Sequence, residues 1–163
     1  MKEIILDNID VKLLELLQTD ASQSNQSLAE KVHISPPTCL RRIKAFRDCG
    51  LIEREIAILN SDKLAEIQGF GLTALVEITL DRQGAEHLEA FEARVILDVA
   101  VQQCYRVSPG PDFCLIVYCA DMPAYLALAN QLFTQDANVR NVKAFFSTKR
   151  AKFDLKISLE HLK

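Results

Sequence analysis

One stretch of the sequence, Ser27 to Ile52, restricts the possible fold more than any other. It reads SLAEKVHISPPTCLRRIKAFRDCGLI, which predicts a short helix, a tight turn and a longer helix rich in positive charge. We expect the short helix over Ser27–Val32, with Ser27 as its N-cap and Glu30 completing a capping box. Three apolar residues form its expected inner side: Leu28, Ala29 and Val32.

The longer helix follows a turn at His33 and Ile34 and has clear start and stop signals. Ser35 is the expected N-cap, and the two prolines after it suit a first turn, where backbone N–H groups have no partner within the helix. The helix is predicted to run to Cys49 and to stop at Gly50. Its apolar residues recur at helical spacing and predict a buried face of Cys39, Leu40, Ile43 and Phe46.

The other side of this helix predicts DNA binding. Short polar groups at a helix start and arginines along its outer face suit a major groove, because arginine bonds guanine edges bidentately and Arg and Lys neutralise phosphates. A solvated helix face is the alternative reading of such a charge run, and the capped helix and tight turn before it favour a helix-turn-helix. The predicted DNA-contacting residues are Ser27, Ser35, Pro36, Pro37, Thr38, Arg41, Arg42, Lys44 and Arg47.

The rest of the first 60 residues completes a three-helix unit. Asp7–Leu17 is the expected first helix, and Thr19–Gln26 is polar and loop-like. The segment Ile52–Leu59 turns extended and serves as a linker strand, followed by a connection with a helical turn over Asn60–Gly71. The expected inner stripe of the first helix is Ile9, Leu13, Leu16 and Leu17. We therefore predict a helix-turn-helix domain over residues 1–60 and a second domain over residues 61–163.

The second domain has a different periodicity. Alternating apolar residues over Leu72–Leu80 predict a strand with one buried side. Further strands are expected over residues 97–107, 113–120, 139–147 and 151–159, and helices over residues 83–95 and 122–135. The expected inward residues of the helices are Ala85, Leu88, Phe91 and Val95, then Tyr125, Leu126, Ala129 and Leu132.

This order predicts an α+β protein whose second domain is a ferredoxin-like βαββαβ sandwich with two helices on one face of an antiparallel sheet. The other face of such a sheet needs a partner, so we expect at least a homodimer.

Composition narrows the class of protein. The net charge of −3 argues against a generic polyanion binder. The charge is unevenly distributed: residues 61–139 carry 11 acidic and 4 basic groups, whereas residues 140–163 carry 2 acidic and 7 basic groups. Positive charge is therefore concentrated in the predicted DNA-contacting helix and in the last two dozen residues. Five cysteines without a CxxC pair predict neither a disulfide framework nor a zinc site. The acidic N-terminal residues do not resemble a signal peptide, and no apolar run reaches the roughly 18 residues of a membrane span. A cytoplasmic protein without a membrane partner is expected.

These stretches together resemble the Lrp/AsnC family of transcriptional regulators. The resemblance covers LDNIDVKLLELLQTDASQSNQSLAEKV and HISPPTCLRRIKAFRDCGLI, then VEITL, CYRVS, DMPAY and NV…TKRAK in the second domain. It implies a homodimer, commonly assembled into an octamer, that binds double-stranded DNA and responds to a small amino-acid effector bound between dimers. No other cofactor is implied.

The resemblance also implies where the effector binds. The family's loop between the second and third strands usually reads Gly-Asp-Tyr-Asp after Val-Ser, whereas this chain has Pro109 in place of the first glycine. Proline removes a backbone donor, so an effector carboxylate would lose that contact. From chemistry alone the loop is a turn, Asp112 satisfies turn amides, Asp121 is an N-cap and Met122 fills the core. The implied effector-binding residues are Ser108, Pro109, Gly110, Pro111, Asp112, Phe113, Asp121 and Met122. Apolar Phe113 and Met122 favour leucine or methionine.

Catalysis has little support in the sequence. His33, His87 and His161 lack metal-ligand spacing, and neither a phosphate-binding glycine loop nor a GxSxG motif is present. Cys104 with His87 as a nucleophile and base is outweighed by a buried structural cysteine. Two rivals to the DNA-binding regulator therefore remain. One is a small-molecule-sensing module that regulates a protein partner, which would not need Arg41 and Arg42; the other is an enzyme, which would need a catalytic constellation.

Overall fold

The computed structural model describes residues 5–69 and 71–162, which belong to two compact units. The first unit comprises residues up to Ile58 together with the C-terminal segment from Lys152, and the second comprises Leu59–Ala151. The C-terminal segment thus groups with the helical unit, whereas the sequence predicts a second domain over residues 61–163. Part of that predicted range, Phe70 and Lys163, lies outside the described residues.

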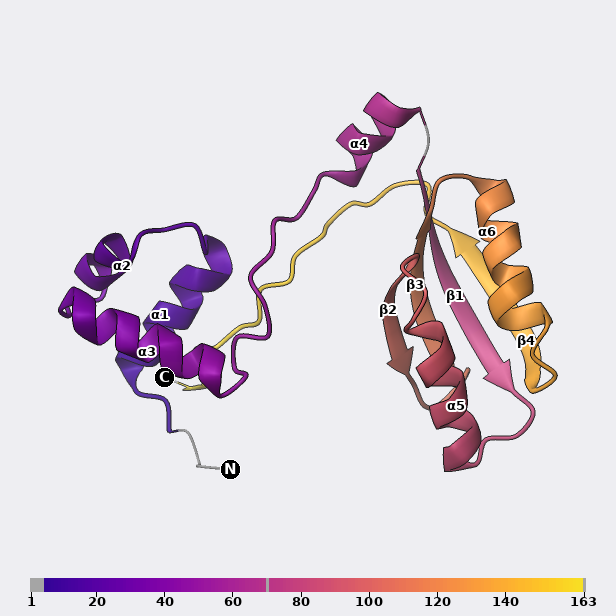
Figure 1. The fold of residues 1–163 in the computed structure, drawn as a ribbon, viewed down its shortest axis with the longest axis horizontal. Coiled ribbons are helices and arrows are strands. Elements are labelled where there is room, and N and C mark those ends of the chain that lie inside the picture. Colours follow the sequence, from indigo (N-terminus) through magenta and orange to yellow (C-terminus); the bar gives the residue numbers. More distant parts are fainter. Residues whose placement is uncertain (1–4, 70, 163) are drawn as a thin grey trace. The chain divides into compact units, whose positions relative to one another are not determined.

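Three helices form the first unit: α1 (Asn8–Thr19), α2 (Asn25–Lys31) and α3 (Pro36–Asp48) (Figure 1). The prediction that Ser27 caps the second helix is wrong. Ser24 is the N-cap of α2, and its side chain accepts a hydrogen bond from the Ser27 amide. The helix begins at Asn25, two residues earlier than expected, because the Ser24 side chain already supplies the N-cap.

The core of the first unit is largely the predicted one. Buried side chains from the three helices are Leu13, Leu14, Leu28, Ala29, Val32, Cys39, Ile43 and Phe46. Leu40 is 55% exposed and not buried as expected. In α1, Val11 and Leu14 are buried, while Ile9, Leu16 and Leu17 only pack against the cluster from its edge. The buried stripe on α1 is therefore rotated from the predicted one, and Leu13 and Leu14 share the cluster with buried residues of α2 and α3.

The C-terminal segment docks on α1. The side-chain amide of Gln18 donates to the Ile157 carbonyl at 3.1 Å and accepts from the Ile157 amide at 2.7 Å, and Leu159 packs against the core. This segment adopts no strand, so the prediction that residues 151–159 complete the sheet is wrong. The linker over residues 53–60 is likewise not a strand, and helix α4 (Ser61–Gln68) follows it with Asn60 as N-cap.

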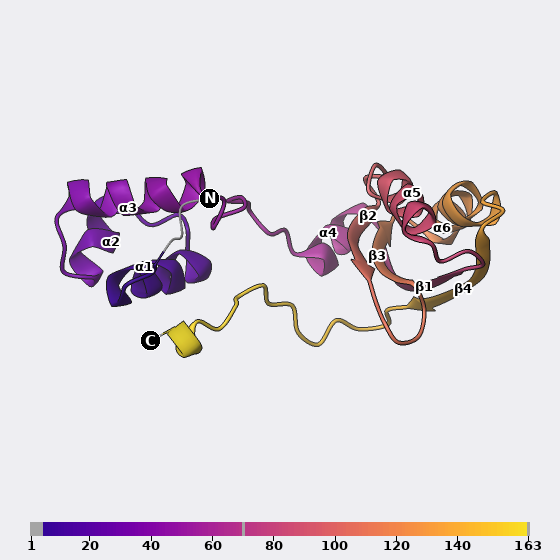
Figure 2. The same cartoon turned by 90° about the horizontal axis from the view of Figure 1, so that it is seen from below.

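In the second unit, the described residues form one four-stranded antiparallel sheet with strand order β2-β3-β1-β4. The strands are β1 (Leu72–Leu80), β2 (Val101–Arg106), β3 (Phe113–Cys119) and β4 (Val139–Phe146). Helices α5 (Ala85–Val95) and α6 (Met122–Ala129) lie on the same side of this sheet (Figure 2), and α6 continues as a π-helical turn over Asn130–Thr134. The predicted ferredoxin-like βαββαβ order is confirmed.

The core of the second unit lies between the helices and the sheet. Ala74, Val76, Ile78 and Leu80 alternate inward along β1 as predicted, and Phe91 stacks on Phe113 with ring centroids 4.7 Å apart. Two predicted inward residues are exposed, Ala85 and Leu126, and Leu128 and Phe133 take the buried positions instead. Tyr125, Leu128 and Leu132 are three and four residues apart and form the buried face of this helix, so the predicted stripe was placed one neighbour too far to one side at Leu126.

The opposite face of the sheet is uncovered and partly apolar. Leu75 pairs with Phe145 on β4 and Ile116 on β3, so the three side chains lie on the side away from the helices. Leu75 is 45% exposed and Phe145 is 54% exposed.

Candidate nucleic-acid interface and ligand-binding loop

The start of α3 is held in place by short polar side chains. The Ser35 hydroxyl accepts a hydrogen bond from the Thr38 amide and lies 2.8 Å from the Thr38 hydroxyl. Pro36 and Pro37 occupy the first turn as predicted, and the Asn25 side chain of α2 donates to the Pro36 carbonyl at 2.8 Å. His33 adopts a positive φ of 58° in the turn between α2 and α3. This turn and its caps form the tight connection of a helix-turn-helix.

Arg41 and Lys44 form an exposed basic surface on α3. They are three residues apart, so they lie on one side of the helix, and both are exposed. Neither has an ion-pair partner among the residues that the structure describes. Thr38 lies one turn before Arg41 and is partly buried. These side chains are therefore available to an anionic partner.

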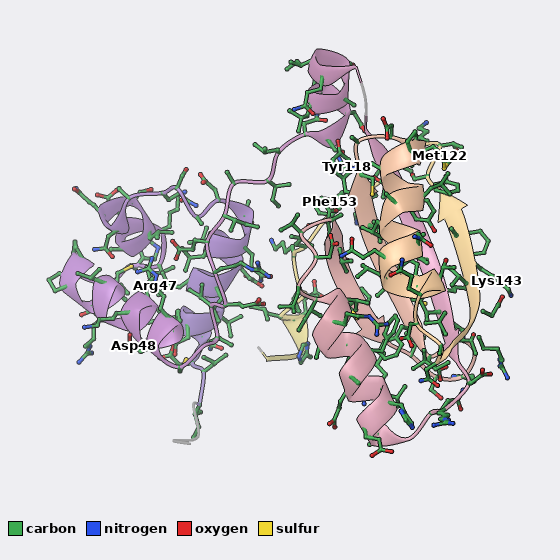
Figure 3. All side chains as sticks on the ribbon, turned by 45° about the vertical axis from the view of Figure 1, so that its right-hand side comes forward. Arg47, Asp48, Tyr118, Met122, Lys143 and Phe153 are labelled. Atoms are coloured by element: carbon green, nitrogen blue, oxygen red, sulfur yellow. The ribbon has the colours of Figure 1, made fainter. Side chains whose placement is uncertain are left out.

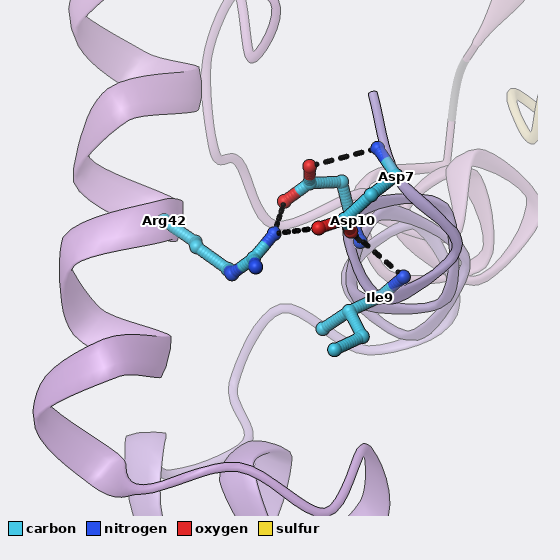
Figure 4. A network of polar contacts seen from close by, with 4 residues as sticks. All are labelled: Asp7, Ile9, Asp10 and Arg42. Atoms are coloured by element: carbon cyan, nitrogen blue, oxygen red, sulfur yellow. Dashed lines mark hydrogen bonds and ion pairs between the residues drawn. The ribbon is translucent and has the colours of Figure 1, made fainter. Parts of the chain in front are cut away.

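Arg42 is placed differently from the predicted DNA-facing position. Its Nη1 lies 2.7 Å from a carboxylate oxygen of Asp7 and 2.6 Å from one of Asp10, both at the start of α1 (Figure 4). Hydrogen bonding from the Asp10 amide is the main cause that lowers the pKa of Asp7, and Arg42 adds to it. The two carboxylates in turn raise the pKa of Arg42. The sequence alone does not indicate these partners of Arg42, although the acids at positions 7 and 10 have the spacing of a capping box.

Arg47 also has an acidic partner within the first unit. Its guanidinium donates two hydrogen bonds to one oxygen of Glu55, at 2.7 and 3.0 Å. Figure 3 labels Arg47 near the end of α3, next to Asp48. The pair is about half exposed. Glu55 therefore neutralises part of the charge that Arg47 could offer to a phosphate, a competition that the sequence did not indicate.

The loop between β2 and β3 begins with a cis peptide bond between Ser108 and Pro109, and Gly110 adopts a φ of 120°. Ser108, Pro109 and Gly110 are exposed. Asp112 closes the loop: one carboxylate oxygen accepts from the Leu80 amide at 2.7 Å and from the Gln83 side chain at 3.2 Å. The Asp112 carboxylate therefore satisfies one backbone donor, which belongs to β1 and not to the turn itself.

The predicted effector-binding residues do not all come together in one chain. Phe113 is fully buried against Phe91 and lines no exposed surface. Asp121 caps α6 by accepting from the Ala124 amide at 2.9 Å. Asp121 and Met122 follow the end of β3, and Figure 3 shows Met122 at the end of the sheet that also carries Tyr118. The loop over residues 107–112 precedes β3, so the seven residues of that strand put about 20 Å between the two groups.

The described residues offer no support for a catalytic or metal site. They contain no group of three or more His, Cys, Asp or Glu side chains that could hold a metal ion. Burial raises the pKa of the Cys104 thiol, which disfavours the thiolate that a nucleophile requires. Among the helices within residues 5–69 and 71–162, none is long and apolar enough to span a membrane.

Comparison with known proteins identifies both units. Residues 73–157 match the model of the Lrp/AsnC ligand binding domain, and residues 6–53 match that of a winged helix-turn-helix DNA-binding domain. The chain belongs to the Lrp/AsnC family. It is 33% identical over 90% of its length to a leucine-responsive regulatory protein of Rhizobium meliloti, of which 92% is covered. It is 31% identical over 96% of its length to the whole of the transcriptional activator DecR of Escherichia coli K12.

Solved structures of transcriptional regulators agree with this assignment. An AsnC family regulator from Agrobacterium tumefaciens superposes with a TM-score of 0.84 at 29% identity, covering 96% of this chain and 99% of that one. A Neisseria meningitidis regulator determined as an L-Met complex gives a TM-score of 0.85 at 28% identity, covering 97% and 99%. The chain is thus a DNA-binding transcriptional regulator with a ligand-binding domain. The alternative, a sensing module that does not bind DNA, is not favoured because the chain has a helix-turn-helix domain with an exposed basic surface.

Proposed function

We propose that this Lrp/AsnC regulator reads its operator with the exposed surface of α3. Arg41 would contact guanine edges in the major groove and Lys44 a phosphate, while Ser35, Pro36, Pro37 and Thr38 bring the helix start close to the groove. The observation that supports this assignment is that Arg41 and Lys44 are exposed and unpaired among the described residues, whereas Arg42 and Arg47 have acidic partners. Ser27 lies inside the first turn of α2 and has no proposed base contact.

Substitution of Arg41 tests this proposal. Arg41→Ala should weaken operator binding by about 1–3 kcal/mol and relax specificity at one base position, if its guanidinium is bidentate to guanine. The measurement is fluorescence anisotropy of the full chain on a DNA duplex from upstream of its own gene and on duplexes with single-base changes. Lys12→Ala, which removes a positive charge from an exposed position on α1, is the control for the loss of a basic side chain elsewhere. An Arg41→Ala variant with wild-type affinity and specificity would disprove the role of Arg41.

We further propose that the second unit binds a small amino acid at the loop over residues 107–112, with the exposed Ser108, Pro109 and Gly110 and the partly buried Pro111 as contact residues. The family assignment supports a ligand in this domain, and the L-Met complex of the Neisseria regulator supports methionine as the first candidate, ahead of leucine. Asp121 and Met122 lie beyond the far end of β3, so they join this site only if a second subunit supplies them.

Isothermal titration of the full chain with methionine, leucine and a panel of other amino acids tests this part. Saturable binding of one amino acid, abolished by Gly110→Val and retained in Gly84→Val, would support the loop as the site. Glycine at position 110 has a positive φ, whereas Gly84 has an ordinary backbone conformation, so the second variant controls for added bulk. Binding that survives Gly110→Val would place the ligand elsewhere.

We infer that the regulator assembles as a homodimer through the uncovered sheet face and further to an octamer, as the family resemblance implies. The exposed apolar side chains of that face support an apolar contact there. From its role in binding DNA we also infer that the protein is cytoplasmic and that it has no enzymatic activity.

A further inference from the structure

Arg42 lies at the edge of the buried face of α3, not on the surface that carries Arg41 and Lys44. The next residue, Ile43, is buried, and the Arg42 side chain retains 25% of its accessible surface. Its guanidinium reaches α1, where one nitrogen, Nη1, contacts the carboxylates of both Asp7 and Asp10 (Figure 4). A side chain in this position is turned toward the first unit's own helices.

The two carboxylates have a second task at the start of α1. Asp7 accepts from the amides of Ile9 and Asp10, at 2.9 and 2.8 Å, through the oxygen that does not face Arg42. Asp10 accepts from the Asp7 amide at 3.0 Å, also through its other oxygen. Each carboxylate therefore uses one oxygen to cap α1 and one to hold Arg42. One guanidinium group thus joins the capped end of α1 to the middle of α3.

Moving Arg42 to DNA would leave a buried charge unpaired. Asp10 is 8% exposed and is the buried charged residue of the described parts of the chain. Loss of one partner from a buried ion pair is strongly destabilising because the remaining charge stays without compensation. Lys44, in contrast, gives up no described ion pair when it contacts a phosphate.

We propose that Arg42 is a positioning residue for DNA binding: it sets the orientation of α3 against α1, and it does not itself contact DNA. The inference rests on the proposed role of α3 in reading the operator. It assigns different tasks to two adjacent arginines, Arg41 for the groove and Arg42 for the helix that carries it.

The salt dependence of binding separates a phosphate contact from a positioning role. Each neutralised phosphate contributes about −0.9 to the slope of log Kobs against log salt concentration. We expect Lys44→Met to reduce the magnitude of the slope by about 0.9. Arg42→Met should weaken binding by about tenfold, or about 1.4 kcal/mol, with the slope unchanged. The measurement uses the full chain on the same upstream duplex at several KCl concentrations. A slope reduced by about 0.9 in Arg42→Met would overturn the proposal.

A double-mutant cycle gives a second readout. If Arg42 acts through Asp10, Asp10→Asn weakens DNA binding, and it adds little to the loss already caused by Arg42→Met. If Arg42 contacts DNA, Asp10→Asn releases the guanidinium and leaves affinity equal to or tighter than wild type. The second result would contradict the positioning role.

The dependence of stability on pH tests the ion-pair arrangement without DNA. The pKa of Asp7 is lowered in the folded protein, so its contribution to stability is present above its ordinary pKa of 3.8 and is lost as the pH falls through the folded value. Because Arg42 is one cause of the lowering, the unfolding temperature of wild type should fall more between pH 5 and acid pH than that of Arg42→Met. Coinciding profiles would refute the arrangement. Failure of wild type to bind any duplex would instead refute the proposed function, and the pH profiles would still report on the ion pairs.

Discussion

Single residues decide how much of the positive charge on α3 reaches DNA. Arg47 has a partly exposed acidic partner in Glu55, and exposed pairs contribute about 0–1 kcal/mol. Glu55→Gln should therefore tighten DNA binding by up to about fivefold, because the charge of Arg47 is no longer neutralised by an anion. Glu53→Gln, which removes an acid of the Arg54 pair two residues away, is the matched control in the anisotropy assay. Equal effects of the two substitutions would show a general charge effect and no role for Arg47.

A second residue-scale prediction concerns Asp112. Its carboxylate accepts from the Leu80 amide on β1, so Asp112→Ala leaves that partly buried donor unsatisfied. The free energy of unfolding of the ligand-free protein should fall by about 1–3 kcal/mol, measured by urea denaturation. Asp81→Ala, at an exposed acid whose ion pair with Arg140 is 4.0 Å long, controls for loss of an acidic side chain in a loop. Unchanged stability of Asp112→Ala would mean that the carboxylate is free for an effector's ammonium group.

At the scale of elements, the start of α2 shows how a cap sets a helix boundary. Ser24 accepts from the Ser27 amide, and its replacement by alanine removes one partner of the first-turn N–H groups. Ser24→Ala should destabilise the first unit by about 1 kcal/mol. Ser27→Ala should change stability by less than about 0.5 kcal/mol, because its side chain caps nothing. Urea unfolding followed by the helical circular dichroism signal measures both, and the reverse order would restore Ser27 as the cap.

At the scale of the whole molecule, the uncovered sheet face predicts self-association. Phe145 is 54% exposed on that face, and a charge there would be buried without a partner in a face-to-face dimer. Phe145→Asp should therefore yield a monomer in analytical ultracentrifugation, whereas wild type sediments as a dimer or larger. Leu126→Asp, on the outer side of α6, introduces the same charge at a residue that is 58% exposed on the helical layer, and it should remain at least dimeric. A dimeric Phe145→Asp variant would rule out this face as the dimer contact.

The order of the helices and strands in the sheet domain and most of the core residues could be predicted from the residues alone. Local signals carried that information: Ser35 followed by two prolines starts α3, Asp121 caps α6, and the alternation along β1 marks its buried side. Such features depend on spacing along the chain and on short-range hydrogen bonds, so the printed residues are enough to predict them. The exposed basic residues Arg41 and Lys44 were found in the same way.

Only the folded structure shows which charged side chains have partners and which predicted site residues lie apart. Arg42 and Asp10 are 32 residues apart, and Asp112 is 32 residues from Leu80, so no local pattern indicates these contacts. The separation of Met122 from the loop over residues 107–112 likewise depends on the length and direction of β3. The segments over residues 53–60 and 151–159 have strand-like sequences, yet strand formation needs a neighbour that supplies hydrogen bonds. Composition sets the propensity of such a segment, and only its surroundings in the fold provide the pairing.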